Sequence, residues 1–312
     1  MEFAISITDL TKNFGNFTAV DKVNLDIKPG EVCAFLGPNG AGKTTVIRML
    51  CGILQPSSGF GSVLGYDLLK ETESIKQNLG YMSQKFSLYV DLTVIENLNF
   101  YAGIYRIDKK TRKKRIEEML HLAGLEQNQN QLVKVLSQGF KQRLALACAV
   151  ISNPAVIFLD EPTSGVSPTA RRSFFNLIQE QAANGKTIIV STHFMDEAER
   201  CGKIAFFNEG RLLALDNPDK LKKDVIKGYI YRIEVDNPVA VLEKINDLPG
   251  ILNANLYGRA LHVNLGYQDD QATLYEYTGT VPELIEPTLE DVFLTLAGKR
   301  GGRLDGENTR RN

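Results

Sequence analysis

A short glycine-rich segment carries the most specific chemical pattern in the sequence. It fits G-x-x-x-x-G-K-[ST] and comprises Gly37, Pro38, Asn39, Gly40, Ala41, Gly42, Lys43 and Thr44, with Thr45 directly after it. Glycines allow a tight turn in which successive N–H groups point inward and form a nest for an anion. In this pattern the lysine reaches the β- and γ-phosphates of a nucleotide, and the hydroxyl of the next residue coordinates Mg²⁺. The segment therefore predicts a phosphate-binding loop.

Two adjacent acids form the second candidate site. Asp160 and Glu161 follow the apolar run Val156–Leu159, which is typical of a buried strand. Asp160 could hold Mg²⁺ through its water shell, because Mg²⁺ needs only one or two carboxylates besides phosphates. Glu161 could polarise a water that attacks the γ-phosphate. An acid pair after a strand could equally cap the next element, but the phosphate loop upstream favours the catalytic interpretation.

Alternating strands and helices must position these residues. The apolar run Glu31–Leu36 leads into the glycine-rich segment, and a helical stretch, Lys43–Leu54, follows it at once. A strand, a loop and a helix in this order is the context that a phosphate loop requires, and the helix N-terminus adds attraction for anions. Further strands are predicted over Phe3–Thr8, Val23–Ile27, Ala155–Leu159 and Thr187–Ser191, and helices over Thr93–Tyr105, Pro168–Ala182 and Phe194–Arg200.

The pattern changes after about residue 226. Three strands and two helices are expected there, over Tyr229–Val235, Val239–Ile245, Ile251–Leu256, Ala260–Leu265 and Pro287–Ala297. They contain no cluster of catalytic residue types, and the polar segment that follows is rich in Gly and Arg, which predicts disorder. We therefore expect a first domain over residues 1–226, a small C-terminal α+β accessory domain over 227–298, and a disordered tail over 299–312.

Length and composition limit the class of protein. The 312 residues suit about two domains, and 43% hydrophobic with 23% charged residues is ordinary for a soluble globular chain. Lys and Arg total 36 against 37 Asp and Glu, whereas a dedicated nucleic-acid binder is usually far more basic. No apolar run approaches the roughly 18 residues of a membrane span, and Met1–Leu10 lacks the basic region of a signal peptide. A membrane role would therefore come through a partner.

Two further features have ordinary interpretations. The four cysteines, Cys33, Cys51, Cys148 and Cys201, form no CxxC pair, so we expect reduced thiols. The basic run Lys109–Arg115 predicts a solvated helix face, and contact with an anionic lipid or partner is the alternative.

Three more motifs follow in order. Gln84 ends Tyr81-Met82-Ser83-Gln84, the segment Leu136–Arg143 (LSQGFKQR) opens a helix, and His193 comes just after a predicted strand. Together with the phosphate loop and the acid pair, this order resembles the ATP-binding cassette (ABC) ATPase family over residues 1–226. The resemblance implies a P-loop NTPase α/β fold with a mostly parallel sheet core, an antiparallel β-subdomain and a helical subdomain at about residues 85–150.

The resemblance also implies ATP and Mg²⁺ as ligands and gives roles to individual residues. Phe14 matches the aromatic side chain that stacks on adenine, with a core aromatic as the alternative. Gln84 matches the residue that contacts Mg²⁺ and water and senses a membrane partner. His193 matches the switch histidine that contacts the γ-phosphate. Ser137 and Gly139 match the signature motif, whose helix N-terminus faces the γ-phosphate held by a second subunit.

One cassette in the chain implies a second copy or a paralogous ATPase subunit, so that two ATP molecules are sandwiched between two cassettes. ATP would join the subunits, and hydrolysis would let them part. Two positions depart from the family pattern. Gln138 stands where the family has Gly, and Ser167 stands where it usually has Asp. That Asp helps couple the two sites in the family, so Ser167 bears on coupling rather than on ATP binding.

The C-terminal region resembles one branch of the family. The segment Pro287–Leu294 (PTLEDVFL) and the α+β appendage are similar to those of ABC-2-type exporter ATPases. This implies a Mg²⁺-dependent ATPase at the cytoplasmic face of the cell membrane. It would power efflux of drugs or other small molecules, lipids or polysaccharides through integral membrane permease subunits. Gln84–Asn99 would receive their coupling helix, with Leu88, Tyr89 and Leu92 as apolar contacts, or else as local core.

A soluble ABC ATPase that acts on nucleic acid or ribosomes is the alternative function. Translation-factor members usually carry two cassettes in one chain, and DNA-repair members insert long coiled coils between the phosphate loop and the signature. The stretch between Lys43 and Ser137 has no sustained heptads, and the net charge of -1 is not basic. We therefore expect no nucleic-acid partner. A P-loop kinase, the third possibility, gives no reason for the Ser137 helix or for His193.

Overall fold

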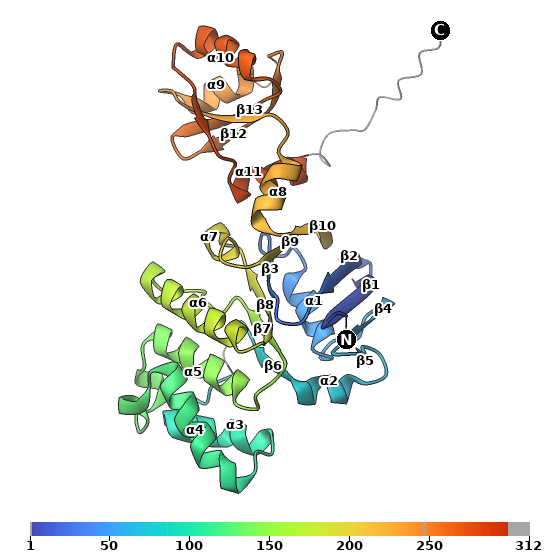
Figure 1. The fold of residues 1–312 in the computed structure, drawn as a ribbon, viewed down its shortest axis with the longest axis vertical. Coiled ribbons are helices and arrows are strands. Elements are labelled where there is room, and N and C mark those ends of the chain that lie inside the picture. Colours follow the sequence, from blue (N-terminus) through green and yellow to red (C-terminus); the bar gives the residue numbers. More distant parts are fainter. Residues whose placement is uncertain (1, 86, 246–247, 299–312) are drawn as a thin grey trace. The chain divides into compact units, whose positions relative to one another are not determined.

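The computed structural model describes residues 2–85, 87–245 and 248–298 (Figure 1). The chain divides into two compact units, Met1–Leu215 and Asp216–Asn312. The division falls before helix α8 (Pro218–Val225), whereas the sequence placed this helix in the first domain. The reason is packing, because α8 lies against α11 (Leu289–Gly298) of the second unit. The predicted tail at 299–312 lies outside the described residues.

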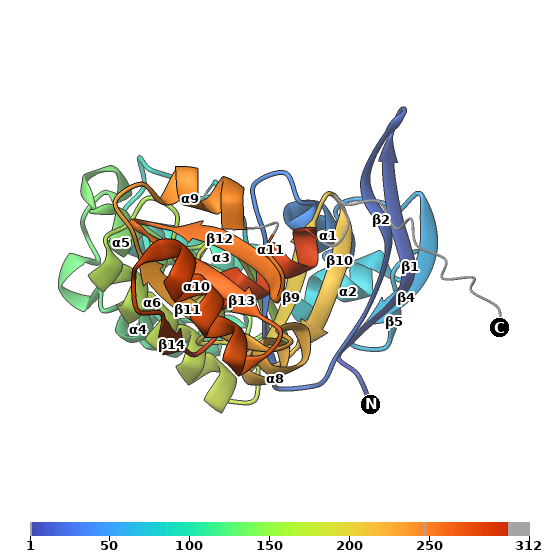
Figure 2. The ribbon, with the colours of Figure 1, turned by 90° about the horizontal axis from the view of Figure 1, so that it is seen from above.

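A six-stranded sheet in the order β10-β9-β3-β8-β7-β6 forms the centre of the first unit. Every residue of β3, β7 and β8 is buried, as expected for parallel strands covered on both faces. Figures 1 and 2 place α1 (Lys43–Leu50) and α6 (Pro168–Ala183) on opposite sides of this sheet. The strands are β3 (Val32–Leu36), β6 (Leu79–Met82), β7 (Val156–Asp160), β8 (Thr187–Thr192), β9 (Lys203–Asn208) and β10 (Arg211–Asp216).

The register of the parallel strands brings their carboxyl ends to one edge. Leu36, the last residue of β3, lies opposite Thr192 of β8, and Asp160, the last residue of β7, lies opposite Ser191. In sheets of this type, ligands bind beyond the carboxyl ends of the strands. The loops that follow β3, β7 and β8 therefore share one site.

An antiparallel sheet in the order β2-β1-β4-β5 completes the core of the first unit. Its inward residues, such as Ile5 and Leu10, share one hydrophobic cluster with Val46 and Ile47 of α1 and Phe35 of β3. The expected antiparallel β-subdomain is thus present. Its strands are β1 (Ile5–Phe14), β2 (Phe17–Ile27), β4 (Ser58–Val63) and β5 (Tyr66–Asp67).

The helices of the first unit are α1 (Lys43–Leu50), α2 (Thr72–Asn78), α3 (Val94–Ile104), α4 (Lys109–Ala123), α5 (Gln138–Val150), α6 (Pro168–Ala183) and α7 (Met195–Ala198). Two 3-10 turns, Glu126–Asn128 and Val133–Val135, connect α4 to α5. Helices α3, α4 and α5 pack together as the expected helical subdomain. The basic run forms the start of α4, where Arg115 donates to the carbonyls of Val150 and Ile151 while the lysines are exposed.

Helix α1 ends at Leu50, earlier than the predicted Leu54. Gly52 takes a left-handed conformation with φ of 65°, and its amide turns back to the carbonyl of Met49. The amide of Ile53 returns to Arg48 in the same way. This is the usual glycine stop of a helix, which the apolar pattern of the sequence concealed.

The second unit is an α+β fold around an antiparallel sheet in the order β12-β13-β11-β14. Its elements are β11 (Tyr229–Glu234), α9 (Pro238–Ile245), β12 (Ile251–Tyr257), β13 (Ala260–Leu265), a 3-10 turn (Gln268–Asp270), α10 (Gln271–Thr278), β14 (Glu283–Ile285), and the helices α8 and α11. The sequence pattern missed α10 and β14, because each buries too few residues to show a period. His262 of β13 and Asp291 of α11 form a buried pair, with Nδ1 and Oδ1 3.0 Å apart.

The state of the cysteines and the character of the helices both bear on the expectations from the sequence. The four cysteines are free, as expected from the sequence, and all of them are buried. Within the described ranges, no helix combines the length and apolar character needed to cross a bilayer.

Candidate nucleotide-binding site

The glycine-rich loop between β3 and α1 is shaped by close packing of neighbouring backbone. A Cβ atom on Gly37 would lie 2.1 Å from the carbonyl oxygen of Phe207. Gly42 has φ of 98°, and a Cβ there would lie 2.7 Å from the carbonyl oxygen of Ala19. Strands β9 and β2 therefore press directly on this loop, and a side chain at either position would displace it.

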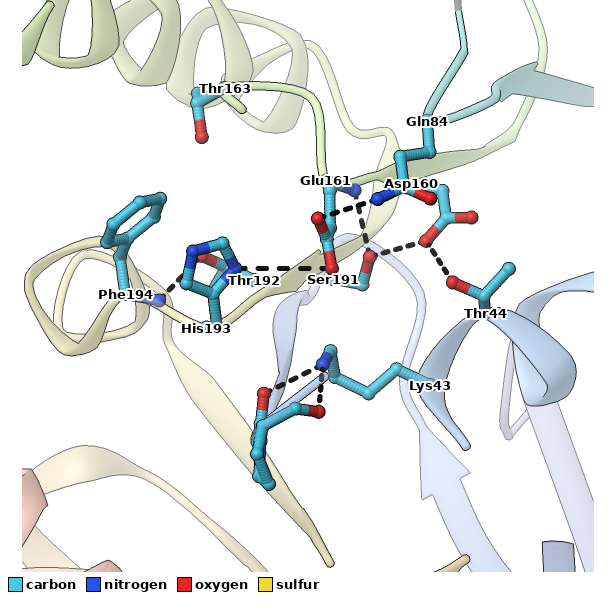
Figure 3. Close-up of polar contacts among 12 residues, drawn as sticks. Lys43, Thr44, Gln84, Asp160, Glu161, Thr163, Ser191, Thr192, His193 and Phe194 are labelled. Atoms are coloured by element: carbon cyan, nitrogen blue, oxygen red, sulfur yellow. Dashed lines mark hydrogen bonds and ion pairs between the residues drawn. The ribbon is translucent and has the colours of Figure 1, made fainter. Parts of the chain in front are cut away.

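Lys43 is the first residue of α1 and is only 4% exposed. Its Nζ donates to the carbonyl oxygens of Gly37 at 2.7 Å and Pro38 at 2.9 Å (Figure 3). Burial lowers the pKa of Lys43, while the nearby Glu161 and Asp160 carboxylates oppose this shift. A buried ammonium held by neutral carbonyls beside a helix N-terminus is well suited to an anionic ligand.

A cavity of about 290 Å³ opens beside the loop. It is lined by Phe14, Phe17, Ala19, Gly40, Ala41, Gly42, Lys43, Thr44, Thr45 and Glu161. Phe14 is 50% exposed, which excludes the alternative of a core aromatic. Phe17, which the sequence analysis did not single out, pairs with Phe14 across the β1–β2 turn and is 66% exposed. A hairpin prediction over this turn would have found it.

Asp160 receives two hydroxyl hydrogen bonds at the end of β7. Thr44 donates to its Oδ1 at 2.9 Å and Ser191 donates to the same oxygen at 2.7 Å. Ser191 also accepts from the backbone N–H of Glu161 at 2.9 Å, so it links the two acids (Figure 3). No sequence motif marked Ser191 as a site residue. The available signal was a polar residue at the end of the apolar strand β8.

The donor set fits Mg²⁺, which prefers oxygen ligands and keeps several waters. The Thr44 hydroxyl and the Asp160 carboxylate are adjacent and buried or half-buried, and Gln84 lies at the same edge (Figure 3). Among the described residues, no group of three or more His, Cys, Asp and Glu side chains could hold a metal ion by itself. Any metal here would therefore depend on hydroxyl, amide and substrate oxygens as well as on one carboxylate.

The three residues predicted to be catalytic meet at this edge. Gln84 Nε2 donates to Glu161 Oε2 at 2.9 Å, and His193 Nδ1 lies 4.0 Å from Glu161 Oε1 (Figure 3). Gln84 follows β6, Glu161 follows β7 and His193 follows β8, so the sheet order alone brings them together. Glu161 has φ of 46°, a left-handed conformation that costs about 1–3 kcal/mol for a non-glycine residue and clusters at functional sites.

The signature residues are not part of this cavity. Ser137 is exposed and caps α5 by accepting from the N–H of Phe140 at 3.4 Å. Neither Ser137 nor Gly139 lines the cavity beside the phosphate loop. Ser167 is also exposed and caps α6, accepting from the N–H of Ala170 at 3.3 Å. Both helix N-termini are therefore open to solvent in the single chain.

Relatives with assigned names support one family. Residues 20–164 match the family described as ABC transporter. The chain is 48% identical over 221 residues to the probable multidrug ABC transporter ATP-binding protein YbhF of Escherichia coli. The aligned region covers 71% of this chain but only 38% of that protein. It is 33% identical over 300 residues to the Nod factor export ATP-binding protein I of Paraburkholderia xenovorans, covering 96% of this chain and 98% of that protein.

Solved structures give the same result. An ATP binding subunit of an ABC transporter matches with a TM-score of 0.64 and 29% identity, over 71% of this chain and 92% of the other. A dimeric ATP-binding cassette in a post-hydrolysis state, bound to ADP and Pi, matches with a TM-score of 0.63 and 28% identity. This match covers 68% of this chain and 98% of the other chain. The order of the motifs, the fold of the first unit and these relatives agree, and the chain belongs to the ABC transporter ATP-binding family.

Proposed function

We propose that this chain binds ATP with Mg²⁺ and hydrolyses it at the carboxyl edge of the central sheet. The observation that carries the proposal is that Lys43, Thr44 and Glu161 line one cavity. Asp160 accepts from Thr44 beside it, and Gln84 and His193 lie around the Glu161 carboxylate. Enzymes of phosphoryl transfer act mainly by positioning and by neutralising charge. This edge offers a buried cation, a carboxylate with hydroxyl partners and a second carboxylate, oriented by Gln84, that can act as a base.

Each side chain has a definite task in this proposal. The N–H groups of the phosphate loop and the Lys43 ammonium bind the β- and γ-phosphates. Thr44, Asp160 and Gln84 would hold Mg²⁺, which when bound neutralises phosphate charge. Glu161 accepts the proton of the attacking water.

Three side chains have supporting roles. Gln84 orients the Glu161 carboxylate through the hydrogen bond at 2.9 Å. His193 contacts the γ-phosphate, and Phe14 stacks on the adenine.

The site is completed by a second chain in this proposal. The exposed N-terminus of α5, with Ser137 and Gly139, would close on the γ-phosphate held by Lys43 of another subunit, which is either a second copy or a paralogue. A free helix N-terminus carries partial positive charge that suits this role. The related cassette solved with ADP and Pi is described as dimeric, which supports the arrangement.

We further propose that the chain powers a membrane exporter from the cytoplasmic face, through contact with permease subunits. Two relatives are named for multidrug transport and for Nod factor export. Tyr89, between Gln84 and Asn99, is 47% exposed and stacks edge-on against Phe100, with ring centroids 4.4 Å apart. Leu88 and Leu92 are half-buried, so Tyr89 and Phe100 are the better candidates for partner contact.

The substitution Glu161→Gln tests the catalytic assignment. It keeps the shape and the possible contact with Gln84 but removes the base. Because a general base contributes about 10²–10⁴ in rate, we expect hydrolysis of Mg-ATP to fall by that factor while ATP binding persists. The exposed Glu180 of α6 gives a matched control, and Glu180→Gln should hydrolyse ATP at the wild-type rate. An undiminished rate in Glu161→Gln would end the assignment.

Co-purification separates the two classes of function. Recovery of a hydrophobic membrane subunit with the tagged chain supports the transport proposal. Recovery of ribosomes or DNA in its place would favour the soluble alternative.

A further inference from the structure

Glu197 is a buried acid that the catalytic scheme does not use. It lies in the short helix α7, four residues after His193, and is 1% exposed. Its carboxylate has donors on both oxygens. The Thr163 hydroxyl donates to Oε1 at 2.5 Å, and the Thr192 hydroxyl donates to Oε2 at 2.5 Å. A cation also approaches, because Arg171 Nε of α6 lies 3.1 Å from Oε1.

The two threonines lie next to the proposed catalytic side chains, Thr163 in the loop after β7 and Thr192 at the end of β8. Thr163 is two residues after Glu161, and Thr192 directly precedes His193 (Figure 3). Thr192 also accepts from the backbone N–H of Phe194 at 3.0 Å, so the turn after β8 is held on both sides of His193. One carboxylate therefore ties the loop after β7 to the loop after β8.

Arg171 also contacts the turn after β8, through the side chain of Phe194. Its guanidinium stacks over the ring of Phe194, 3.6 Å from the centroid. Phe194 in turn lies against His193, with ring centroids 4.0 Å apart. Since Glu197 holds Arg171 by charge, loss of that charge would release both the backbone and the ring that support the histidine.

We infer that Glu197 is a positioning residue that fixes His193 and Glu161 relative to each other by bonding Thr192 and Thr163 at the same time. The inference rests on the proposed hydrolytic function and deepens it. A buried carboxylate with two hydroxyl donors and an arginine is rigid, because moving any one partner leaves a charge unsatisfied. The loops are thereby held as one unit at the edge of the sheet.

Steady-state kinetics of Glu197→Gln provides the first test. The amide has the same shape but cannot accept from both hydroxyls and balance Arg171. Because small misplacement of a catalytic group can cost about 10²-fold, we expect kcat to fall roughly 10- to 100-fold with KM for ATP unchanged. Asp196→Asn is the matched control, since Asp196 also faces Arg171, at 3.6 Å, but its side chain is 71% exposed. It should keep the wild-type kcat.

The hydroxyl of Thr163 gives a second, milder test. Thr163→Val removes one donor to Glu197 and should lower kcat, whereas Thr163→Ser keeps the donor and should restore it. Combining Glu197→Gln with His193→Ala should lower the rate by less than the product of the separate effects, because both act on one unit. Full multiplication of the two effects, or equal rates in the Val and Ser variants, would overturn the inference.

Amide hydrogen exchange of the full chain separates this inference from the proposed function, since it needs no hydrolysis. Glu197→Gln should speed exchange in segments Thr163–Gly165 and His193–Phe194 and leave the phosphate loop at Gly37–Thr45 unchanged. Unchanged exchange in the first two segments, or faster exchange throughout the chain, would refute the positioning role. A wild-type chain without ATPase activity would instead refute the proposed function, and exchange would still decide whether Glu197 ties the loops.

Discussion

At the scale of single residues, Lys43 shows how burial and function are linked. This ammonium is 4% exposed and donates to the carbonyls of its own loop, Gly37 and Pro38, and two nearby carboxylates act on it electrostatically. Burial lowers its pKa, so its charged form is destabilised unless an anion is near. Under the proposed function, a nucleotide phosphate provides that anion.

The substitution Lys43→Ala should therefore abolish ATP binding rather than only slow turnover. Binding of a fluorescent ATP analogue, measured by anisotropy, should show no saturation at concentrations that saturate the wild type. The half-buried Lys141 of α5 is unsuitable as a control because it lies near the proposed interface. Lys76→Ala on α2, whose side chain is 43% exposed, is the better comparison and should bind normally. Normal affinity in Lys43→Ala would contradict the phosphate assignment.

At the scale of elements, the glycine loop depends on the strands packed against it. Because a Cβ on Gly37 would lie 2.1 Å from the Phe207 carbonyl oxygen, Gly37→Ala must move β9 or the loop itself. We expect a lower melting temperature together with weaker ATP binding, both measured on the same preparation. Gly103 of α3 has no atom within 4 Å of an added Cβ, so Gly103→Ala should be neutral or slightly stabilising. Equal melting temperatures for Gly37→Ala and the wild type would contradict this packing account.

The second unit offers a prediction on pH. Burial alone would raise the pKa of Asp291, but hydrogen bonds from His262 and Thr288 outweigh it, and the pKa lies below the usual 3.8. An acid whose pKa is lowered by folding stabilises the folded state above its unfolded pKa and loses this contribution as the pH falls. Asp291→Asn should therefore reduce the unfolding free energy at pH 6 by about 1.5–3 kcal/mol, the value of hydrogen bonds to a charged group.

The same difference should shrink when calorimetry is repeated at a pH below 3.8, because the unfolded carboxylate is protonated there while the folded one keeps its charge down to a lower pH. A difference between Asp291→Asn and the wild type that stays constant from pH 6 to pH 3 would show that the carboxylate charge contributes nothing.

Much of the site was predictable, because its motifs are local. The phosphate loop, Asp160, Glu161, Gln84 and His193 follow strands whose apolar runs are easy to recognise, and parallel strands end at one edge. Gln84 and His193 lie beside the Glu161 carboxylate because of the order of the strands in the sheet. The family resemblance implies this order, whereas hydrophobic periodicity alone does not predict it.

The residues that were missed act through long-range contacts. Ser191 matters because β8 lies beside β7, and Glu197 because its carboxylate reaches Thr163 across the sheet edge. Phe17 can be recognised as a site residue only when the β1–β2 turn is predicted.

In the fold, α10 and β14 were missed and α8 was placed in the wrong unit, since short elements take their location from tertiary packing rather than from their own pattern.

At the scale of the whole molecule, the first unit holds only one part of the proposed site. The phosphate loop and the proposed catalytic residues lie at one edge, while Ser137 and Gly139 lie at the N-terminus of α5 and do not line the same cavity. Under the proposed function, a second chain supplies that helix end. ATP then acts as the bridge, and its hydrolysis removes the charge that joins the subunits. Ser167 caps α6 as an Asp would, so the departure from the family pattern leaves this helix start intact.

The central claim is that nucleotide is enclosed between two chains, and a cryo-EM map of the purified assembly with its membrane subunit, loaded with Mg-ATP and carrying Glu161→Gln, tests it most directly. The account predicts that the γ-phosphate held by Lys43 of one ATPase chain lies within hydrogen-bond distance of the signature serine of the other, which is Ser137 where both chains are copies of this one. A map in which ATP occupies the Lys43 site while the signature helix of every ATPase chain faces solvent would contradict it.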